Sequence, residues 1–206
     1  MKKILVTGGN GRFAQELKKI NTKYEFIFRN KNQLNILSLN SITNNIKKFK
    51  PNSILHLAGL SRPMSIHDKD IKKSIDLNII GTSNIVKICS DRNLKIIFFS
   101  TSYVYPGNRG NYKETDPILP WNNYGWSKAG AEAAVQMYKN SLIIRACMTE
   151  KPFLHKHAYS NVKSNFIFHD KFIKFFLKII NKKGIINIGG KSQTIFDFAK
   201  NYNKKV

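Results

Sequence analysis

KKILVTGGNGRFA, residues 2–14, is the stretch that decides the fold, because it runs from an apolar strand through three glycines into a helix that begins near Arg12. Glycines allow a tight turn and let the backbone approach a bound group closely. A strand, a glycine turn and a helix in this order are typical of the place where an α/β protein binds the pyrophosphate of a dinucleotide. Taken alone, the same pattern also fits an ordinary glycine-rich turn.

A second stretch, Tyr124–Lys128 (YGWSK), places a tyrosine and a lysine four residues apart, and therefore on one face of a helix. A nearby ammonium group favours the phenolate, so we expect Lys128 to lower the pKa of Tyr124 and prepare it for proton transfer at neutral pH. Thr101 follows the apolar run Ile96–Phe99, which should place it at the carboxyl end of a buried strand, where open α/β sheets bind ligands. Such a Tyr-Lys pair arises by chance on many helices. The glycine turn earlier in the chain is the observation that favours a catalytic role for this pair.

Length and composition fit one compact domain: the chain has 206 residues, two cysteines and a net charge of +23. The cysteines suggest no disulfide framework and no apolar run reaches the length of a membrane span, so we expect a cytoplasmic protein with no membrane partner. Nucleic acid is the usual partner of so basic a chain, but the lysines are spread along the whole sequence and no nucleic-acid module is recognisable. We expect no specific nucleic-acid partner, and a basic scaffold that binds RNA remains as an alternative.

Several motifs together resemble the extended short-chain dehydrogenase/reductase family. Thr7–Ala14 resembles its TGxxGxxG/A turn and Tyr124–Lys128 its catalytic YxxxK motif. Further similar stretches are His56–Gly59, Asn78–Thr82, Ser100–Gly107, Phe166–Asp170 and Ile186–Gly190. Within the family, Glu114–Pro117 ahead of Tyr124 is most similar to the 4-keto sugar-nucleotide reductases and epimerases. The resemblance implies an α/β fold with a Rossmann-type doubly wound parallel sheet, helices on both faces and a small C-terminal substrate cap.

The resemblance also implies roles for individual residues. Thr101, Tyr124 and Lys128 would be the catalytic set, with Tyr124 exchanging a proton with a substrate oxygen that Thr101 also contacts; no metal is expected. The expected cofactor-binding residues are Gly8, Gly11, Arg12, Phe13, Arg29, Asn35, Ile36, Leu57, Ala58, Gly59, Tyr124 and Lys128. The expected substrate contacts are Ser61, Arg62, Thr101, Ser102, Tyr124 and Arg145.

The residues after the strand at Tyr24–Phe28 bear on the choice between NADP and NAD. An acidic residue there accepts hydrogen bonds from the ribose hydroxyls, whereas an arginine accommodates a 2′-phosphate. This chain has Arg29, Asn30 and Lys31, so NADP is favoured over NAD, unless the basic residues are merely solvated. Asn35 stands where family members usually carry an aspartate.

The predicted function is that of an NAD(P)-dependent oxidoreductase or epimerase acting at a keto or hydroxyl carbon of a small-molecule sugar or nucleotide-sugar. We expect a single domain, residues 1–206, with a dinucleotide-binding core in 1–145 and a reduced substrate-binding cap in 146–206. The short cap leaves two alternatives open, a compact sugar-acid dehydrogenase and a non-catalytic NAD(P)-binding protein with a degenerate substrate site. By resemblance, the helices within Asp68–Asn93 and Tyr124–Asn140 would form a homodimer interface.

Apolar periodicity predicts one long helix within Asp68–Asn93 and an aromatic-rich helix at Asp170–Asn181. The apolar residues of the second helix are expected in the core: Phe172, Ile173, Phe176, Leu177 and Ile180. His56 is expected to be a half-buried strand residue and not a catalytic one.

Overall fold

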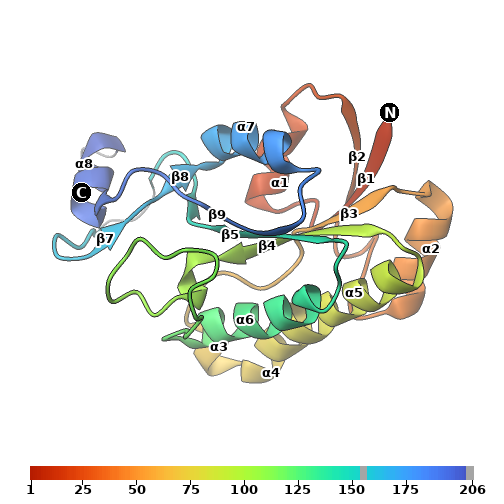
Figure 1. Ribbon diagram of the computed structural model, residues 1–206, viewed down its shortest axis with the longest axis horizontal. Helices are drawn as coiled ribbons and strands as arrows, with labels where there is room; N and C mark the ends of the chain where they lie inside the picture. The colour runs from red at the N-terminus through yellow and green to blue at the C-terminus, as the bar shows by residue number, and fades with distance from the viewer. Residues whose placement is uncertain (154–156, 203–206) are drawn as a thin grey trace.

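The computed structural model describes residues 1–153 and 157–202, and a parallel β-sheet forms its centre (Figure 1). In these residues the sheet has six strands in the order β2-β1-β3-β4-β5-β9. The strands are β1 (Lys2–Thr7), β2 (Tyr24–Arg29), β3 (Ser53–His56), β4 (Lys95–Thr101), β5 (Ser141–Ala146) and β9 (Gly184–Ile188). All neighbouring strands pair in parallel, and the order runs outward from β1 in both directions. The predicted doubly wound α/β fold is therefore confirmed, and it opens a crevice at the carboxyl ends of the strands.

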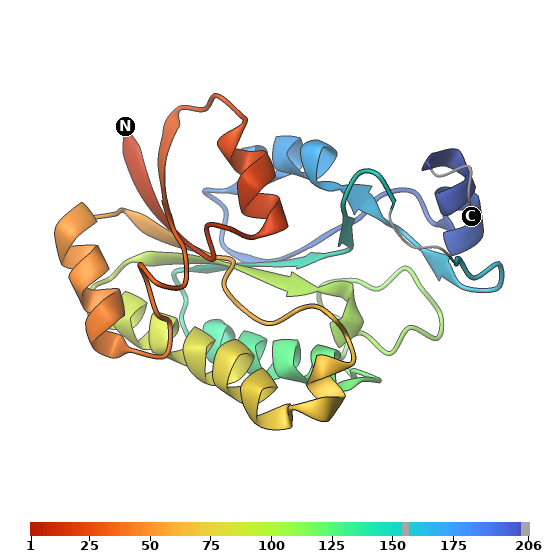
Figure 2. The same cartoon turned by 180° about the vertical axis from the view of Figure 1, so that it is seen from behind.

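Helices cover both faces of the sheet, as Figures 1 and 2 show from opposite sides. The helices α1 (Arg12–Lys18) and α7 (His169–Ile179) lie on one face. The helices α2 (Leu39–Phe49), α5 (Gly81–Asp91) and α6 (Asn123–Gln136) lie on the other. Because both faces are covered, the central strands β3 and β5 are buried along their whole length.

The core on the α1 side is rich in aromatic rings. Phe13 of α1 meets the ring of Phe99 at 4.8 Å and that of Phe172 at 5.5 Å between centroids. Phe172, Ile173, Phe176 and Ile180 are buried and Leu177 is partly buried, as predicted for the helix at Asp170–Asn181. This packing fixes α1, and with it the end of the glycine turn, against the sheet.

The predicted long helix within Asp68–Asn93 is confirmed, since helical structure runs without a gap over residues 71–91. It consists of α4 (Ile71–Ser74), a π-helical turn (Ile75–Ile80) and α5, and the short α3 (Ile66–Lys69) precedes it. Asp70 separates α3 from α4, because its backbone leaves the helical region at φ −137° and its carboxylate accepts a hydrogen bond from the backbone N–H of Lys73. The wide π-helical turn buries Asn78, and such turns are frequent at functional sites.

After β5 the chain forms a small lobe beyond the carboxyl end of the sheet, at the left of Figure 1. Two short strand pairs build it, β6 (Met148–Thr149) with β8 (Ile167–Phe168) and β7 (Lys163–Ser164) with β10 (Gln193–Thr194), and α8 (Ile195–Tyr202) follows. Its small core contains Phe153, Phe168, Phe198 and Ala199. Of the cap predicted at 146–206, residues 154–156 and 203–206 lie outside the described residues, and the division into core and cap stays a prediction.

Candidate active site

The glycine turn after β1 is tied to the end of β3. Thr7 accepts hydrogen bonds at its Oγ1 from the backbone N–H groups of Leu57 (3.2 Å) and Ala58 (3.1 Å). Gly8 has φ +67°, and a Cβ there would stand 2.7 Å from the backbone nitrogen of Ala58. Only glycine combines this left-handed backbone with so close an approach, so the sequence signal at Gly8 reflects a real steric requirement.

The rest of the turn is held by backbone hydrogen bonds. The N–H of Gly9 donates to the carbonyl of Arg29 and the N–H of Gly11 donates to the carbonyl of Gly8, both at 2.8 Å. Arg12 and Phe13 then begin α1, whose first N–H groups have no carbonyl within the helix to bind. The turn therefore presents donors at the carboxyl edge of the sheet.

His56 at the end of β3 is more buried than expected, at 1% exposure. Its Nδ1 lies 2.8 Å from Oγ1 of Thr7 and its Nε2 lies 3.0 Å from Oγ1 of Thr82. Burial, together with the charge of Lys128, lowers the pKa of His56 to about 3, so the ring is neutral. The expectation that His56 is structural agrees with this full set of partners.

Arg29 ends β2 beside the glycine turn, but part of its side chain is engaged. Its Nε donates to Oδ1 of Asn45 at 3.1 Å, and its guanidinium lies 5.1 Å from the centroid of the Phe49 ring. These contacts orient the guanidinium, and its expected role toward a 2′-phosphate stays a prediction.

Asn35 and Ile36, the other residues expected at the adenine end, have local roles. Asn35 accepts a hydrogen bond from the N–H of Leu37 at 3.0 Å, and its own N–H donates to Oγ of Ser41. The side chain of Ile36 is 5% exposed and packs in the core against Gly81. That side chain packs against α5 in a core cluster with Ile85 and Ile88, so little of its surface is accessible to an adenine ring.

Thr101 and Tyr124 meet at the carboxyl end of β4. The hydroxyl group of Thr101 acts on that of Tyr124 and lowers its pKa, and Thr101 also accepts a hydrogen bond from the N–H of Tyr103 at 3.3 Å. Tyr124 enters α6 one residue after its start, where Asn122 caps the helix by accepting from the N–H of Gly125 at 2.7 Å. The strand end and the helix start thus bring together two residues that are 23 positions apart in the sequence.

Lys128 lies one helical turn after Tyr124, with its Nζ 4.1 Å from the centroid of the Phe98 ring. Burial lowers the pKa of Lys128 to about 7, although the charge of Glu132 acts in the opposite direction. Burial also raises the pKa of Tyr124 to about 12, which the hydroxyl group of Thr101 offsets only in part. The expectation that Lys128 lowers the pKa of Tyr124 is therefore wrong here, because loss of hydration disfavours both charged forms.

Asn78 connects the loop after β3 to α6. Its Nδ2 donates to Oγ of Ser127 at 2.8 Å and to the carbonyl of Leu60 at 2.9 Å, while its Oδ1 accepts from the N–H of Leu60. A Cβ at Gly59 would stand 2.9 Å from this Oδ1, which explains the glycine there. Asn78 therefore positions both the loop and the helix that carries Tyr124.

Arg145 does not reach the crevice, and the expectation that it contacts the substrate is wrong. Its guanidinium pairs with Glu132, and the two side chains are 3% and 0% exposed. It also donates to the hydroxyl of Tyr105 at 2.6 Å and to the carbonyl of Glu114 at 3.2 Å, while Oγ of Ser100 donates to Glu132 at 2.7 Å. This buried network ties β5, α6 and β4 together below the site.

Of the other expected substrate contacts, Ser61 and Arg62 lie exposed in the loop after β3 and Ser102 begins a short 3-10 turn after β4. The charge of Arg62 acts to lower the pKa of Tyr124, against the larger effect of burial. Arg62 also pairs at 2.7 Å with Glu150, which pairs at 2.8 Å with Arg12. Sequence reasoning missed Glu150, because nothing local marks it out from other acidic residues.

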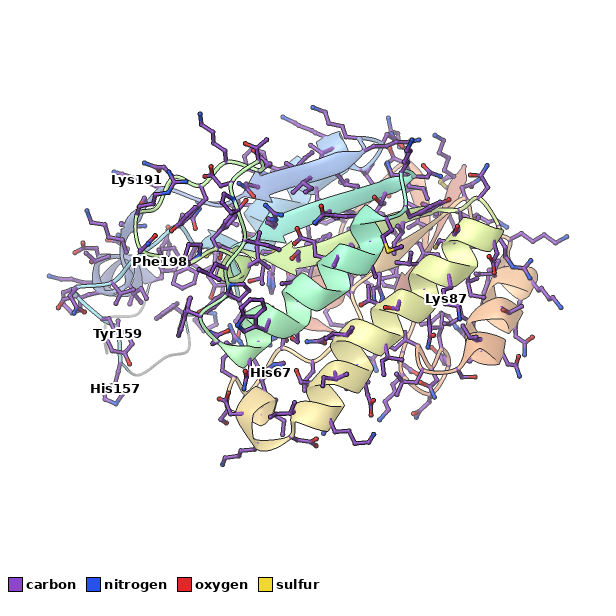
Figure 3. The ribbon with its side chains drawn as sticks, turned by 60° about the horizontal axis from the view of Figure 1, so that its bottom comes forward. His67, Lys87, His157, Tyr159, Lys191 and Phe198 are labelled. Carbon is purple, nitrogen blue, oxygen red and sulfur yellow. The ribbon has the colours of Figure 1, made fainter. Side chains whose placement is uncertain are left out.

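His67 is the second residue that sequence reasoning missed. Figure 3 shows it beside the start of α6, and its ring lies 5.1 Å from that of Tyr124. Its Nδ1 is 2.7 Å from Oγ of Ser74, while its buried Nε2 has no partner among the described residues. With Tyr103, whose ring meets Tyr124 edge-on at 5.7 Å, it confines the tyrosine ring.

In residues 1–153 and 157–202, no helix is both long and apolar enough to span a membrane.

The family model described as RmlD substrate binding domain matches residues 1–151. A dTDP-4-dehydrorhamnose reductase from Aggregatibacter actinomycetemcomitans is 30% identical over 154 residues, covering 72% of this chain and 52% of the relative. The methionine adenosyltransferase 2 subunit beta of Pongo abelii is 32% identical over 103 residues, covering 50% of this chain and 30% of the relative.

Among solved structures, the dTDP-4-dehydrorhamnose reductase of Bacillus anthracis in complex with NADP has a similar fold, with a TM-score of 0.89 at 21% identity. The match covers 99% of this chain and 81% of that structure. The chain spans about half, or less, of the length of the curated relatives that it matches.

Proposed function

The chain belongs to the RmlD substrate binding domain family, as its motifs led us to expect, and from this premise we propose that it is an NADP-dependent reductase of a 4-keto nucleotide-sugar. A relative is named dTDP-4-dehydrorhamnose reductase, and a protein of similar fold was solved with NADP. The observation that carries the proposal is the pairing of Thr101, at the end of β4, with Tyr124, at the start of α6, at the same sheet edge as the glycine turn.

The residues at the glycine turn fit a dinucleotide. A Cβ at Gly8 or Gly9 would come within 2.9 Å of backbone atoms, so the turn is close-packed and leaves its outer side to a ligand. Gly8, Gly11, Arg12 and Phe13 would hold the pyrophosphate, and Leu57, Ala58 and Gly59 the ribose beside it. Arg29 would hold the 2′-phosphate, and Lys128 the second ribose. When bound, NADPH supplies the hydride.

Tyr124 would donate the proton that completes the reduction of the keto group to a hydroxyl. Its pKa of about 12 keeps it protonated at neutral pH, which suits a donor in the reductive direction. Thr101 would share a hydrogen bond with the same oxygen. Lys128, whose pKa lies at about 7, can lose or take up a proton near neutral pH and would replace the one that Tyr124 gives up.

Turnover of dTDP-4-dehydrorhamnose, followed as the loss of NADPH absorbance, tests this proposal. Tyr124→Phe should lower the rate by about a hundredfold or more and leave NADPH affinity nearly unchanged, because only the proton donor is lost. Tyr138→Phe is the matched control, since the Tyr138 hydroxyl is buried without a partner among the described residues. A Tyr124→Phe protein that keeps more than about a tenth of the rate would refute the role.

One comparison favours a second candidate, a non-catalytic NAD(P)-binding subunit. A relative is named as the beta subunit of a methionine adenosyltransferase, so the chain is also similar to a protein named as a subunit of an enzyme of another kind. Tight NADPH binding without turnover of any 4-keto nucleotide-sugar or sugar acid would favour this candidate.

A homodimer is also proposed. Ile71, Ile75, Ile80 and Trp126 are at least 41% exposed, and they lie on the two segments for which the resemblance implies a dimer interface. Light scattering of the parent and an Ile75→Lys variant tests it, and a monomeric parent at micromolar concentration would refute it.

A further inference from the structure

Glu150 joins two arginines from distant parts of the chain, and we name Arg12, Glu150 and Arg62 the arginine clasp. Arg12 begins α1 after the glycine turn, Arg62 lies in the loop after β3, and Glu150 directly follows β6. One carboxylate oxygen of Glu150, Oε1, accepts from Nη1 of Arg12 at 2.8 Å and from Nη1 of Arg62 at 2.7 Å. The partners are 138 and 88 residues from Glu150 in the sequence.

The arginine clasp extends from the glycine turn toward the catalytic tyrosine. At one end, Arg12 directly follows Gly11 of the turn. At the other end, Arg62 lies in the loop after β3, and its charge acts to lower the pKa of both Tyr124 and Tyr103. We expect a dinucleotide that reaches from the glycine turn to Tyr124, as the proposed function requires, to pass close to Arg12 and Glu150.

The carboxylate of the clasp is held firmly, and its two arginines are open to solvent. The side chain of Glu150 is 17% exposed, against 47% for Arg12 and 38% for Arg62. Partial burial alone would raise the pKa of Glu150, but the charges of Arg62 and Arg12 outweigh it and hold that pKa below its ordinary value. Glu150 is therefore ionised at neutral pH, and it competes with any anion that approaches the two arginines.

The clasp also borders a cavity of about 330 Å³, lined among others by Asn10, Arg12, Glu16 and Glu150. This cavity opens beside the glycine turn, so an anion reaches the guanidinium of Arg12 without displacing the core. Phosphate oxygens bind a guanidinium with the same fork geometry as a carboxylate. A phosphate group and Glu150 are thus direct alternatives as partners of Arg12.

We propose that Glu150 is an internal competitor for the phosphates of the dinucleotide and thereby sets the affinity of the cofactor site. It holds Arg12 and Arg62 together across the path of the cofactor, and the pyrophosphate must take Arg12 from it. This inference rests on the proposed function, because it takes a dinucleotide as the ligand. Glu150 is a positioning residue in this account and touches no reacting atom.

The test is NADPH binding, measured by calorimetry and by the change in NADPH fluorescence at low salt. Glu150→Gln should bind NADPH about threefold to tenfold more tightly than the parent, since two partly exposed ion pairs no longer compete. Glu150→Asp keeps the charge but is one methylene shorter and cannot bridge both arginines, so it too should bind NADPH more tightly. Added salt should shrink these differences.

Glu16→Gln is the matched control. Glu16 lines the same cavity and carries the same charge, but it pairs with Lys19 and not with the arginines of the clasp. An equal gain for Glu16→Gln and Glu150→Gln would overturn the proposal, because the effect would then be general repulsion. The gain from Glu150→Gln should also disappear in an Arg12→Met, Arg62→Met background, and a gain that persists there would overturn it as well.

The two proposals fail in different ways. If the parent and all variants bind NADPH with equal affinity, the arginine clasp is refuted and the proposed function stands. If neither the parent nor Glu16→Gln binds NADPH at all, both are refuted. Urea unfolding of each variant verifies that the altered protein is folded.

Discussion

Replacing Arg145 by methionine should destabilise the protein strongly, because it leaves a buried carboxylate without its counter-ion. Glu132 is fully buried and Arg145 is 3% exposed, so water cannot take over the lost interaction. Removing one partner of a buried ion pair typically costs about 3–5 kcal/mol of unfolding free energy. The hydroxyl of Tyr105 and the carbonyl of Glu114 also lose a donor, which puts the expected loss in the upper part of that range.

Urea unfolding followed by circular dichroism measures this loss, and thermal unfolding provides a second reading. For a chain of this size, each kcal/mol lowers the melting temperature by about 2–4 °C, so Arg145→Met should melt about 6–20 °C below the parent. Lys19→Met is the matched control, since it removes a cation paired with Glu16 where the side chains are 64% and 35% exposed. That exposed pair should contribute no more than about 1 kcal/mol.

The reasoning fails if Arg145→Met loses less than about 1 kcal/mol of stability. The same experiment distinguishes a structural role of Arg145 in the buried network from the substrate contact that the sequence led us to expect. An arginine that contacted the substrate would leave the unfolding curve unchanged on substitution and would weaken only substrate binding. Loss of stability without selective loss of binding supports the role that the structure gives to Arg145.

Three further predictions follow from the geometry of single residues. Gly8→Ala should lower the free energy of unfolding in urea by at least about 2 kcal/mol and weaken NADPH binding, because φ is +67° and the new Cβ would stand 2.7 Å from the backbone of Ala58. Gly184→Ala is the control, since this glycine has φ +89° in open space, and it should lower that free energy by only about 1 kcal/mol. Equal losses for the two variants would contradict this prediction. Arg29→Asp should reverse a preference for NADPH over NADH, and equal dissociation constants of the parent for the two cofactors would exclude the premise. Burial lowers the pKa of His56 from 6.5 to about 3 in the folded protein, so on acidification the unfolded chain takes up a proton at a higher pH than the folded protein does. Stability is therefore lost as the pH falls from 6.5 towards 3. The urea midpoint should fall less between pH 7 and pH 5 in His56→Gln than in the parent, and an equal fall would refute the assignment.

The π-helical turn within the long helix of Asp68–Asn93 is a feature that the apolar stripe did not predict. The stripe at Ile71, Ile75 and Ile79 indicates a helical period, and the segment is indeed helical. A wider π-helical turn keeps nearly the same stripe, so periodicity does not distinguish the two. The turn is stabilised instead by the contacts of Asn78 with Leu60 and Ser127, which are 18 and 49 residues away.

The sequence by itself determined the features whose cause is local. The apolar runs became β1, β3, β4 and β5, since a strand covered on both faces needs apolar side chains in succession. The glycine at position 8 was readable because no other residue accepts a left-handed backbone so close to a neighbouring strand. Tyr124 and Lys128 could be paired because four residues make about one helical turn.

Only the tertiary structure decided the partners of the charged and buried polar groups. Arg145 and Arg62 were alike in the sequence as candidate substrate contacts, yet one is buried against Glu132 and the other lies in an exposed loop with Glu150. The pKa of Tyr124 moved against the expectation for the same reason, since burial and not sequence spacing dominates it, as burial also dominates the lowered pKa of Lys128. Coulomb attraction and desolvation depend on distance and burial in space, which packing of distant segments sets.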